Sequence, residues 1–213
     1  MDQKTIRAYN HSAKEYDDET IDFWKKFPRT FFDKFAKLAK GKVLSIGSGP
    51  GRDGIILKEA GIDVTCLDAS KAMVKLSEEK GLRSVLGDFN ALPFDNNSFE
   101  GIWAYTSLLH VPKSEIWKAL AEIKRVLKND GVFGLGLIEG QTEEYKESSV
   151  INMPRWFSFY NKKEIDELLR KHGFKIVHFE EFKPKSKNYL NFIAKKKQQR
   201  IQKNELRTDS IHQ

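Results

Sequence analysis

The sequence predicts an α/β fold: a doubly wound, mostly parallel sheet of about seven strands, with an antiparallel hairpin at its C-terminal edge and helices before it. Apolar runs of strand length alternate with helical stretches from residue 42 onward, which is typical of parallel sheets with right-handed crossovers. The first run, 42–46, stops at a glycine-rich turn that leads into a helical stretch. Residues 183–187 join the last two runs without a helix, so these two strands are predicted to be antiparallel.

Residues 1–40 are expected to form helices. Their apolar residues recur at helical spacing: Trp24, Phe27, Phe31, Phe35 and Leu38. Pro28 interrupts this stripe and predicts a kink or a break between two short helices, because proline lacks an N–H donor. Most of the stripe is interpreted as core packing, and part of it can line a pocket.

The later elements are predicted from apolar runs and from turn residues. The predicted strands are 42–46, 62–67, 83–87, 99–105, 131–139, 174–182 and 188–195. The predicted helices are 52–60, 70–80, 113–127 and 161–172. Four glycines each follow a polar helical stretch and are predicted to stop the helices: Gly61, Gly81, Gly131 and Gly173. Ser70 and Asn161 are predicted N-caps, and 140–158 is predicted to be irregular and to cross the carboxyl edge of the sheet.

Composition excludes several classes of protein. Cys66 is the single cysteine, so a disulfide framework and a cysteine-based zinc site are excluded, and no metal site is predicted. No apolar run is long enough to span a bilayer and the N-terminus has no signal-peptide pattern, so we expect a cytoplasmic protein. Of the net charge of +7, residues 195–213 carry +4, which a solvated tail explains better than RNA binding because no RNA-binding motif accompanies it. No feature of the sequence indicates an oligomeric state.

The glycine-rich turn at residues 47–51 is the most informative segment. Glycine adopts positive φ without strain and lets a ligand lie against bare backbone, and the N–H groups of the next helix point into that space. The second predicted strand ends in Asp68, 21 positions after Gly47. This is close to the spacing at which an acid binds ribose hydroxyls in dinucleotide-binding folds. Turn and acid together predict a ligand that contains adenosine.

Two other nucleotide sites fit the sequence less well. Residues 49–54 match G-x-G-x-x-G, which also occurs in nicotinamide dehydrogenases. However, no tyrosine has a lysine four positions later, no second domain is available, and Arg52 stands where the dinucleotide pattern requires a small residue. A phosphate-binding P-loop is excluded because no Gly-Lys-Ser/Thr follows the turn.

Four blocks of the chain, taken in order, resemble the class I S-adenosylmethionine-dependent methyltransferases, in particular the type 11 or UbiE-like group. The blocks are 43–51, 67–73, 87–100 and 122–131. The resemblance covers about residues 9–195 and implies a Rossmann-like fold. Asn129-Asp130-Gly131 stands where the family usually has Pro-Gly, and Phe99-Glu100 where it commonly has Phe-Asp.

The resemblance also implies a division of the chain. Residues 1–195 would form one methyltransferase domain, with 1–40 as a helical cap and 41–139 as the cofactor-binding core. Residues 140–195 would supply the acceptor side and the edge strands. Residues 196–213 would form a basic, flexible tail.

S-adenosylmethionine is the cofactor that the resemblance implies. The residues that would bind it are Tyr16, Gly47, Ser48, Gly49, Gly51, Arg52, Asp68, Ala69, Met73, Asp88, Phe89 and Thr106. Asp68 would accept hydrogen bonds from both ribose hydroxyls. Met73 would pack against the adenine, and Asp88 would accept from its amino group. Arg52 and Tyr16 would reach the methionyl carboxylate.

The acceptor side is predicted from ionisable and aromatic residues. Its candidates are Tyr9, Trp24, His110, Arg155 and Tyr160. His110 is the candidate catalytic group, because histidine titrates near neutral pH, and its alternative is a packing role before Pro112. An arginine beside aromatic residues suits an anionic or aromatic acceptor, and its alternative is an ordinary loop anchor. Tyr9 is also a second candidate for the methionyl carboxylate.

The predicted activity is methyl transfer from S-adenosylmethionine to an oxygen, nitrogen or sulfur atom of a small molecule by in-line displacement. Cytosine-5 chemistry is excluded because Cys66 lies on the wrong strand for a nucleophile. Residues 106–111 replace the Asn/Asp-Pro-Pro-Tyr/Phe loop that often serves amino acceptors. The alternatives are an RNA-modifying methyltransferase that uses the basic tail, and a protein that binds S-adenosylmethionine without catalysis.

Overall fold

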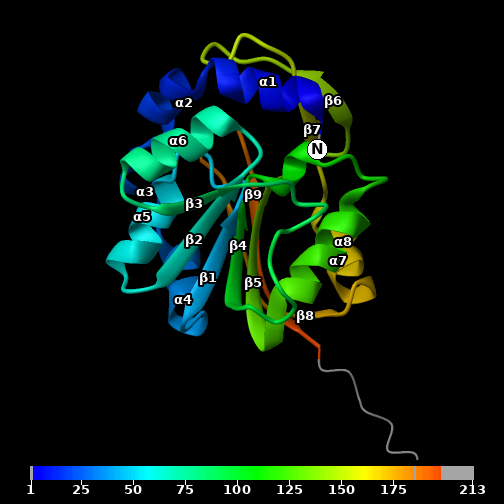
Figure 1. Ribbon diagram of the computed structural model, residues 1–213. Coiled ribbons are helices and arrows are strands. Elements are labelled where there is room, and N and C mark those ends of the chain that lie inside the picture. Colours follow the sequence, from blue (N-terminus) through cyan, green and yellow to red (C-terminus); the bar gives the residue numbers. More distant parts are fainter. Residues whose placement is uncertain (1, 185, 198–213) are drawn as a thin grey trace, which may run out of the picture.

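A seven-stranded sheet forms the centre of the protein, in the strand order β3-β2-β1-β4-β5-β9-β8 (Figure 1). The computed structural model describes residues 2–184 and 186–197. The strands of this sheet are β1 (Lys42–Ile46), β2 (Asp63–Asp68), β3 (Arg83–Leu86), β4 (Phe99–Tyr105), β5 (Leu127–Ile138), β8 (Phe174–Phe182) and β9 (Tyr189–Lys196). Strands β1 to β5 pair in parallel, whereas β9 is antiparallel to both β5 and β8. The predicted fold class is confirmed.

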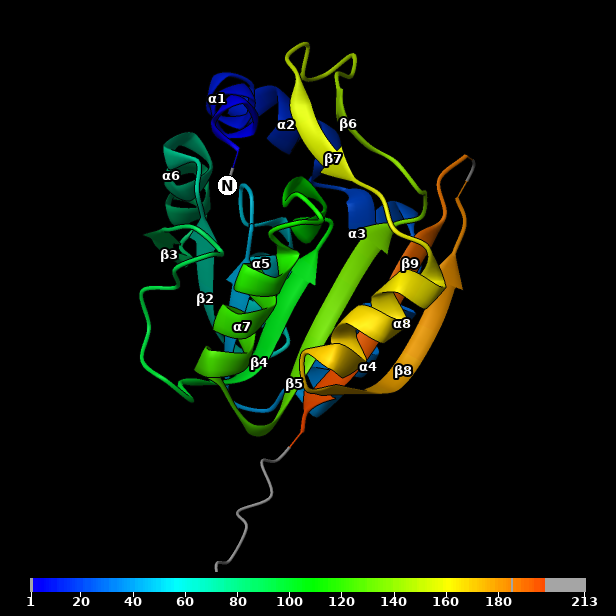
Figure 2. The same cartoon turned by 90° about the vertical axis from the view of Figure 1, so that its right-hand side faces the viewer.

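Helices cover both faces of the sheet and the carboxyl ends of its parallel strands (Figures 1 and 2). They are α1 (Gln3–His11), α2 (Ala13–Thr20), α3 (Phe23–Lys26), α4 (Thr30–Leu38), α5 (Arg52–Glu59), α6 (Lys71–Glu79), α7 (Ile116–Val126) and α8 (Lys162–Lys171), with a short 3-10 helix, η1 (Leu108–His110). Among the described residues, no helix is long and apolar enough to cross a bilayer.

Side-chain alternation along the strands creates two apolar layers. Leu44 and Ile102 face the layer formed with α7 and α8. Val43 and Trp103, their neighbours in sequence, face the layer that holds the aromatic residues of α4. Burial on both faces is typical of a parallel sheet whose crossovers are helical. Leu38 does not join the second layer, because it is 43% exposed at the end of the predicted stripe.

The N-terminal helices break where the sequence predicts, since α3 ends at Lys26 and α4 begins at Thr30, on either side of Pro28. Helices α1 and α2 lie over the carboxyl ends of the strands, at the top of both overall views (Figures 1 and 2). Asp2 caps α1 by accepting from the Thr5 N–H at 2.7 Å. These helices therefore form a cover over the edge of the sheet at which the glycine-rich turn lies.

The prediction that 140–158 is irregular is wrong in part. β6 (Glu143–Lys146) and β7 (Arg155–Ser158) form a separate two-stranded antiparallel sheet. β7 packs beside α1, and the Trp156 N–H donates to Thr5 Oγ1 at 2.8 Å. Charged residues dominate β6, so the sequence lacks the apolar alternation that predicts a strand.

The predicted helix end at Gly131 is also wrong. α7 ends at Val126, and β5 begins at the next residue, Leu127, which is fully buried. The strand then passes through an irregular register against β4 before regular pairing resumes at Val132. Burial of Leu127 in the core turns the backbone into an extended conformation several residues before the glycine.

Other local predictions are confirmed. Gly61, Gly81 and Gly173 follow their helices with φ of 79°, 74° and 84°. Ser70 accepts from the Met73 N–H at 3.2 Å, and Asn161 forms a capping box at the start of α8. The predicted basic tail at 196–213 lies outside the described residues from position 198 onward.

Candidate cofactor and acceptor site

Two adjoining cavities lie at the carboxyl ends of β1, β2 and β4, next to α1 and α2. Their volumes, including the open mouths, are about 630 Å³ and about 1380 Å³. Six residues line both: Tyr9, Tyr16, Thr20, Arg52, Thr106 and His110. β1 pairs with β2 on one side and with β4 on the other, so the chain order reverses here. Ligands of open α/β sheets bind at such switch points.

The glycine turn forms one wall of the first cavity. Gly47 and Gly49 have φ of 58° and 54°, a backbone conformation that side chains with a Cβ rarely adopt. A Cβ at Gly49 would come no closer to any group than 3.9 Å from Tyr16 Cε1, so this backbone is open toward the cavity. Gly51, by contrast, packs against Leu82 and Ser77 and does not line either cavity.

Asp68 stands at the end of β2 and lines the first cavity. Its Oδ2 accepts from the Gly49 N–H at 2.8 Å, and its Oδ1 accepts from the Ser70 N–H at 2.9 Å. These two bonds fix the carboxylate while leaving each oxygen a lone pair for a ligand hydroxyl. Burial raises the pKa of Asp68, and the backbone N–H donors oppose that rise.

The residues predicted for the adenine end are only partly brought together. Met73 and Phe89 line the first cavity and are almost fully buried. Ala69 and Asp88 do not line it. Asp88 Oδ1 accepts from the Asn90 N–H at 3.0 Å, which holds this carboxylate in a turn.

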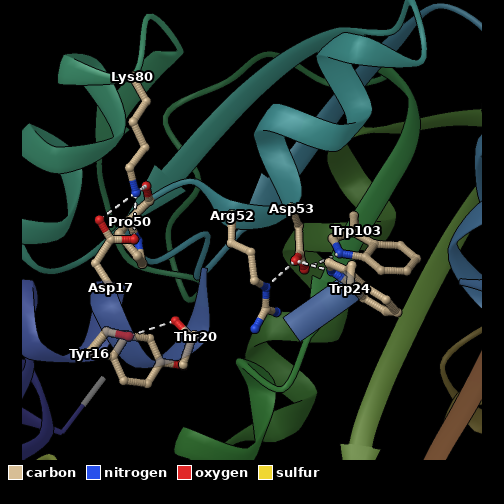
Figure 3. A network of polar contacts seen from close by, with 9 residues as sticks. All are labelled: Tyr16, Asp17, Thr20, Trp24, Pro50, Arg52, Asp53, Lys80 and Trp103. Carbon is tan, nitrogen blue, oxygen red and sulfur yellow. Dashed lines mark hydrogen bonds and ion pairs between the residues drawn. The ribbon is translucent and has the colours of Figure 1, made fainter. Parts of the chain in front are cut away.

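Asp53 is a central residue of the site that the sequence analysis missed (Figure 3). This buried carboxylate accepts from Arg52 Nε at 2.6 Å and from two indole N–H groups, those of Trp24 and Trp103, at 2.7 Å each. Burial opposes its charge, but the Arg52 guanidinium and the indole donors together hold the pKa of Asp53 below its usual value. The sequence offers one indirect signal for a carboxylate here. Trp24 belongs to the apolar stripe, and the N–H of a buried tryptophan requires an acceptor.

Arg52 is thereby fixed between the two cavities. Its guanidinium stacks over the Phe23 ring at 4.7 Å, and its Nε is bound to Asp53. No described side chain accepts from its terminal Nη atoms, which remain available to a ligand. Trp24, a predicted acceptor-binding residue, lies outside the lining of both cavities and donates to Asp53, to which Arg52 is also bound (Figure 3).

A second polar contact joins the helical cover to the glycine turn (Figure 3). Lys80 Nζ donates to both carboxylate oxygens of Asp17 in α2 at 2.6 Å and to the Pro50 carbonyl at 2.8 Å. One ammonium group therefore holds α2, the end of α6 and the turn together. Tyr16, one residue before Asp17, is placed on the cavity wall by the same contact.

The acceptor side centres on His110 in η1. Its Nδ1 lies 2.6 Å from the Trp156 carbonyl, which can only accept, so Nδ1 carries the hydrogen. Nε2 therefore accepts from the Tyr9 hydroxyl at 2.8 Å. Burial lowers the pKa of His110 to about 4, so the ring is neutral at pH 7.

Arg155 and Tyr160 take different positions. Arg155 lines the second cavity and donates from Nη1 to the Tyr9 hydroxyl oxygen at 3.2 Å. Tyr160 lines neither cavity and is buried in the apolar layer with α7 and α8. Three predicted acceptor residues, Tyr9, His110 and Arg155, are thus brought together from α1, η1 and β7.

Several lining residues had no signal in the sequence. They are Thr20, Pro50, Tyr105 and Ser107. Thr106, which was predicted, has φ of 54° although it is β-branched. Strain of this kind persists only where surrounding structure enforces it, and it often marks functional sites. Among the described residues, no group of three histidine, cysteine or acidic side chains is placed to hold a metal ion.

Comparison with known proteins agrees with this geometry. Residues 44–135 match a family model described as a methyltransferase domain. The malonyl-[acyl-carrier protein] O-methyltransferase of Salmonella typhimurium is 30% identical over 177 residues, which cover 79% of this chain and 68% of that protein. The demethylmenaquinone methyltransferase of Renibacterium salmoninarum is 33% identical over 109 residues. This match covers 50% of this chain and 45% of that relative.

A solved structure has the same fold. The structure of the DhpI complex with S-adenosylhomocysteine superposes with a TM-score of 0.78 at 20% sequence identity. The alignment covers 92% of this chain and 97% of that one, so the likeness extends over nearly the whole fold.

Proposed function

The chain belongs to the class I S-adenosylmethionine-dependent methyltransferases, and on that premise we propose that it methylates an oxygen, nitrogen or sulfur atom of a small molecule held in the second cavity. The observation that carries this proposal is the shared lining of the two cavities. Tyr9, Arg52 and Thr106 border both spaces, so a ligand in each would meet at these residues. Proximity of this kind is the main requirement for methyl transfer.

The residues of the first cavity fit S-adenosylmethionine. Asp68 offers one free lone pair on each oxygen to a pair of ribose hydroxyls, and Gly49 leaves space for a ligand against the backbone. Arg52 offers its Nη donors to a carboxylate. When bound, the cofactor supplies a methyl group on a cationic sulfur, and the lone pair of the acceptor atom displaces the sulfur, which keeps the electrons of the broken bond.

The residues of the second cavity orient the acceptor and exclude water. Helices α1 and α2 cover the carboxyl ends of the strands (Figure 2). His110 fixes the direction of the Tyr9 hydroxyl, whose oxygen also accepts from Arg155. A histidine with a pKa of about 4 is a weak base at neutral pH, so the site favours an acceptor atom that carries no proton to be removed.

The cellular setting is part of the proposal. The single cysteine is buried in β2 and needs no oxidising compartment, which supports a location in the cytoplasm. A small-molecule acceptor is favoured over RNA because the second cavity is a hollow lined by residues of α1, α2 and β7. The RNA alternative depends on the basic tail at 196–213, of which 198–213 lie outside the described residues.

A transfer assay tests the proposal. Methyl-labelled S-adenosylmethionine is incubated with the full chain and a panel of small carboxylic acids, phenols, amines and thiols, and S-adenosylhomocysteine is measured. We expect acceptor-dependent product with at least one class, and none with the Asp68→Ala variant at the same cofactor concentration. Cofactor binding without turnover on any acceptor would favour the non-catalytic alternative. Transfer only to RNA, falling steeply with salt and lost on deletion of 196–213, would favour the RNA alternative.

A further inference from the structure

Arg155 is a buried cation that has no acidic partner among the described residues. Its side chain is 7% exposed, and it donates from Nη1 to the Tyr9 hydroxyl oxygen and from Nη2 to Ser148 Oγ, each at 3.2 Å. Its Nε has no hydrogen-bond partner among the described residues, and no described carboxylate forms an ion pair with it. Burial of an uncompensated charge is costly, so its retention here calls for an external partner.

Arg52 shows what compensation looks like in the same protein. Its guanidinium is similarly buried but is bound to Asp53 at 2.6 Å. Both arginines line the second cavity, whereas only Arg52 lines the first. The carboxylate of the cofactor is therefore assigned to Arg52, and the charge of Arg155 is left for the other ligand.

The surroundings of Arg155 are also positively charged. The basic residues that line the second cavity are Lys26, Arg52, Arg155 and Lys187, against one acid, Glu19, among the described residues. The guanidinium of Arg155 lies 5.4 Å from the Tyr9 ring centroid and 5.2 Å from that of Phe157. Because aromatic rings lie beside the guanidinium, a ligand is recognised by the N–H donors in its plane. These donors match the planar shape of a carboxylate.

We propose that the acceptor carries a carboxylate group that binds Arg155 in the second cavity. This inference rests on the proposed function, because it takes the second cavity to be the acceptor site. The ligand supplies the negative charge that none of the described carboxylates places beside Arg155. Methyl transfer then requires that the accepting atom face the first cavity while the carboxylate is bound to Arg155. This atom belongs either to another part of the same molecule or to the carboxylate itself.

Matched acids and amides test the proposal by calorimetry. The full chain, saturated with S-adenosylhomocysteine, is titrated with benzoate and benzamide, phenylacetate and phenylacetamide, and hexanoate and hexanamide. We expect at least one carboxylate to bind roughly tenfold more tightly than its amide, because only the acid forms charge-assisted bonds. Arg155→Gln is expected to abolish this preference, and Arg155→Lys to retain part of it. Arg170→Gln, which removes an exposed cation on α8, is the matched control and should leave the preference unchanged.

The outcomes separate the inference from the proposed function. If no acid in the panel binds more tightly than its amide, or if Arg155→Gln keeps the preference, the inference is wrong. Tight binding of phenylphosphonate without binding of any carboxylate also overturns it. Unchanged affinity for S-adenosylhomocysteine in Arg155→Gln and Arg155→Lys shows that these variants fold. Acids that bind through Arg155 but yield no methylated product contradict the proposed function alone, whereas turnover of neutral acceptors that is insensitive to Arg155→Gln contradicts the inference alone.

Discussion

The two cavities differ in how their charges are balanced. In the first, Asp68 is bound by two backbone N–H groups and Arg52 by Asp53, so each charge has partners before any ligand arrives. In the second, Arg155 is also buried, and the described residues give its guanidinium two hydrogen-bond partners, both neutral: the hydroxyls of Tyr9 and Ser148. On the proposed assignment, the protein itself preorganises the charges of the cofactor side, whereas the acceptor side receives its balancing charge from the ligand.

The largest effect is expected at the compensated arginine. Asp53→Asn removes the charge that balances Arg52 and replaces one acceptor oxygen by an NH2 donor, which cannot accept from an N–H, so at least one of the three bonds to this side chain is lost. We therefore expect the free energy of unfolding to fall by roughly 3–5 kcal/mol. Urea unfolding measures it. Asp33→Asn, which breaks an exposed pair with Arg29 at 3.8 Å, is the control and should cost under about 1 kcal/mol. Equal losses in the two variants would show that the buried pair contributes no more to stability than the exposed one.

The next effect concerns cofactor affinity. Asp68→Ala removes the carboxylate that we propose to accept from the two ribose hydroxyls, and it removes the acceptor of the Gly49 and Ser70 N–H groups. We therefore expect S-adenosylhomocysteine to bind roughly 100-fold more weakly by calorimetry. Asp63→Ala, at the exposed start of the same strand, should bind as the unmodified chain does. An Asp68→Ala affinity within a few-fold of the unmodified protein would contradict the ribose assignment.

His110 predicts a dependence of stability on pH. Its pKa is about 4 in the folded state and near 6.5 when unfolded, so below pH 6.5 the unfolded state binds a proton that the folded state excludes. Stability therefore falls as the pH decreases from 6.5 toward 4. Between pH 7.5 and pH 5, the free energy of unfolding of the unmodified protein should fall by about 2 kcal/mol more than that of the His110→Gln variant. Urea unfolding at both pH values measures this difference. If the free energies of unfolding of the two proteins change equally with pH, the His110 imidazole is not held neutral in the folded state.

The smallest effect is expected at the uncompensated arginine. Arg155→Met removes a buried charge together with its cost, so the free energy of unfolding without ligands should change by no more than about 1 kcal/mol. The same urea titration that measures Asp53→Asn measures this variant. A loss as large as that of Asp53→Asn would mean that Arg155 is already compensated within the protein, and the contrast between the cavities would not hold.

The sheet and the cofactor side could be predicted because their signals are local. The turn at 47–51 and Asp68 each follow a short apolar strand, and parallel pairing of β1 with β2 brings them together at one edge. Asp53 was missed because its partners, Trp24 and Trp103, are distant in sequence, and an acid in the first turn of a helix is ordinarily only a favourable charge.

The acceptor side could not be assembled from the sequence. Tyr9, His110 and Arg155 come from three separate elements, and their contact depends on where α1 and β7 pack. Residue types suggested each of them singly, but neither the hydrogen bonds of His110 nor the missing partner of Arg155 is visible in a linear pattern. Tyr160, chosen on the same grounds, lies in the core instead.

The indoles of Trp24 and Trp103 share the Asp53 carboxylate, which also holds Arg52 at the border of the two cavities. A ligand that accepts hydrogen bonds from the Arg52 guanidinium is expected to change the electric field at both indole rings. Of the other two tryptophans, Trp117 is 51% exposed on α7, and neither it nor Trp156 donates to this carboxylate. If the cofactor binds Arg52 as we propose, the ultraviolet emission of these two indoles is expected to change on binding, so that binding can be followed without an attached dye.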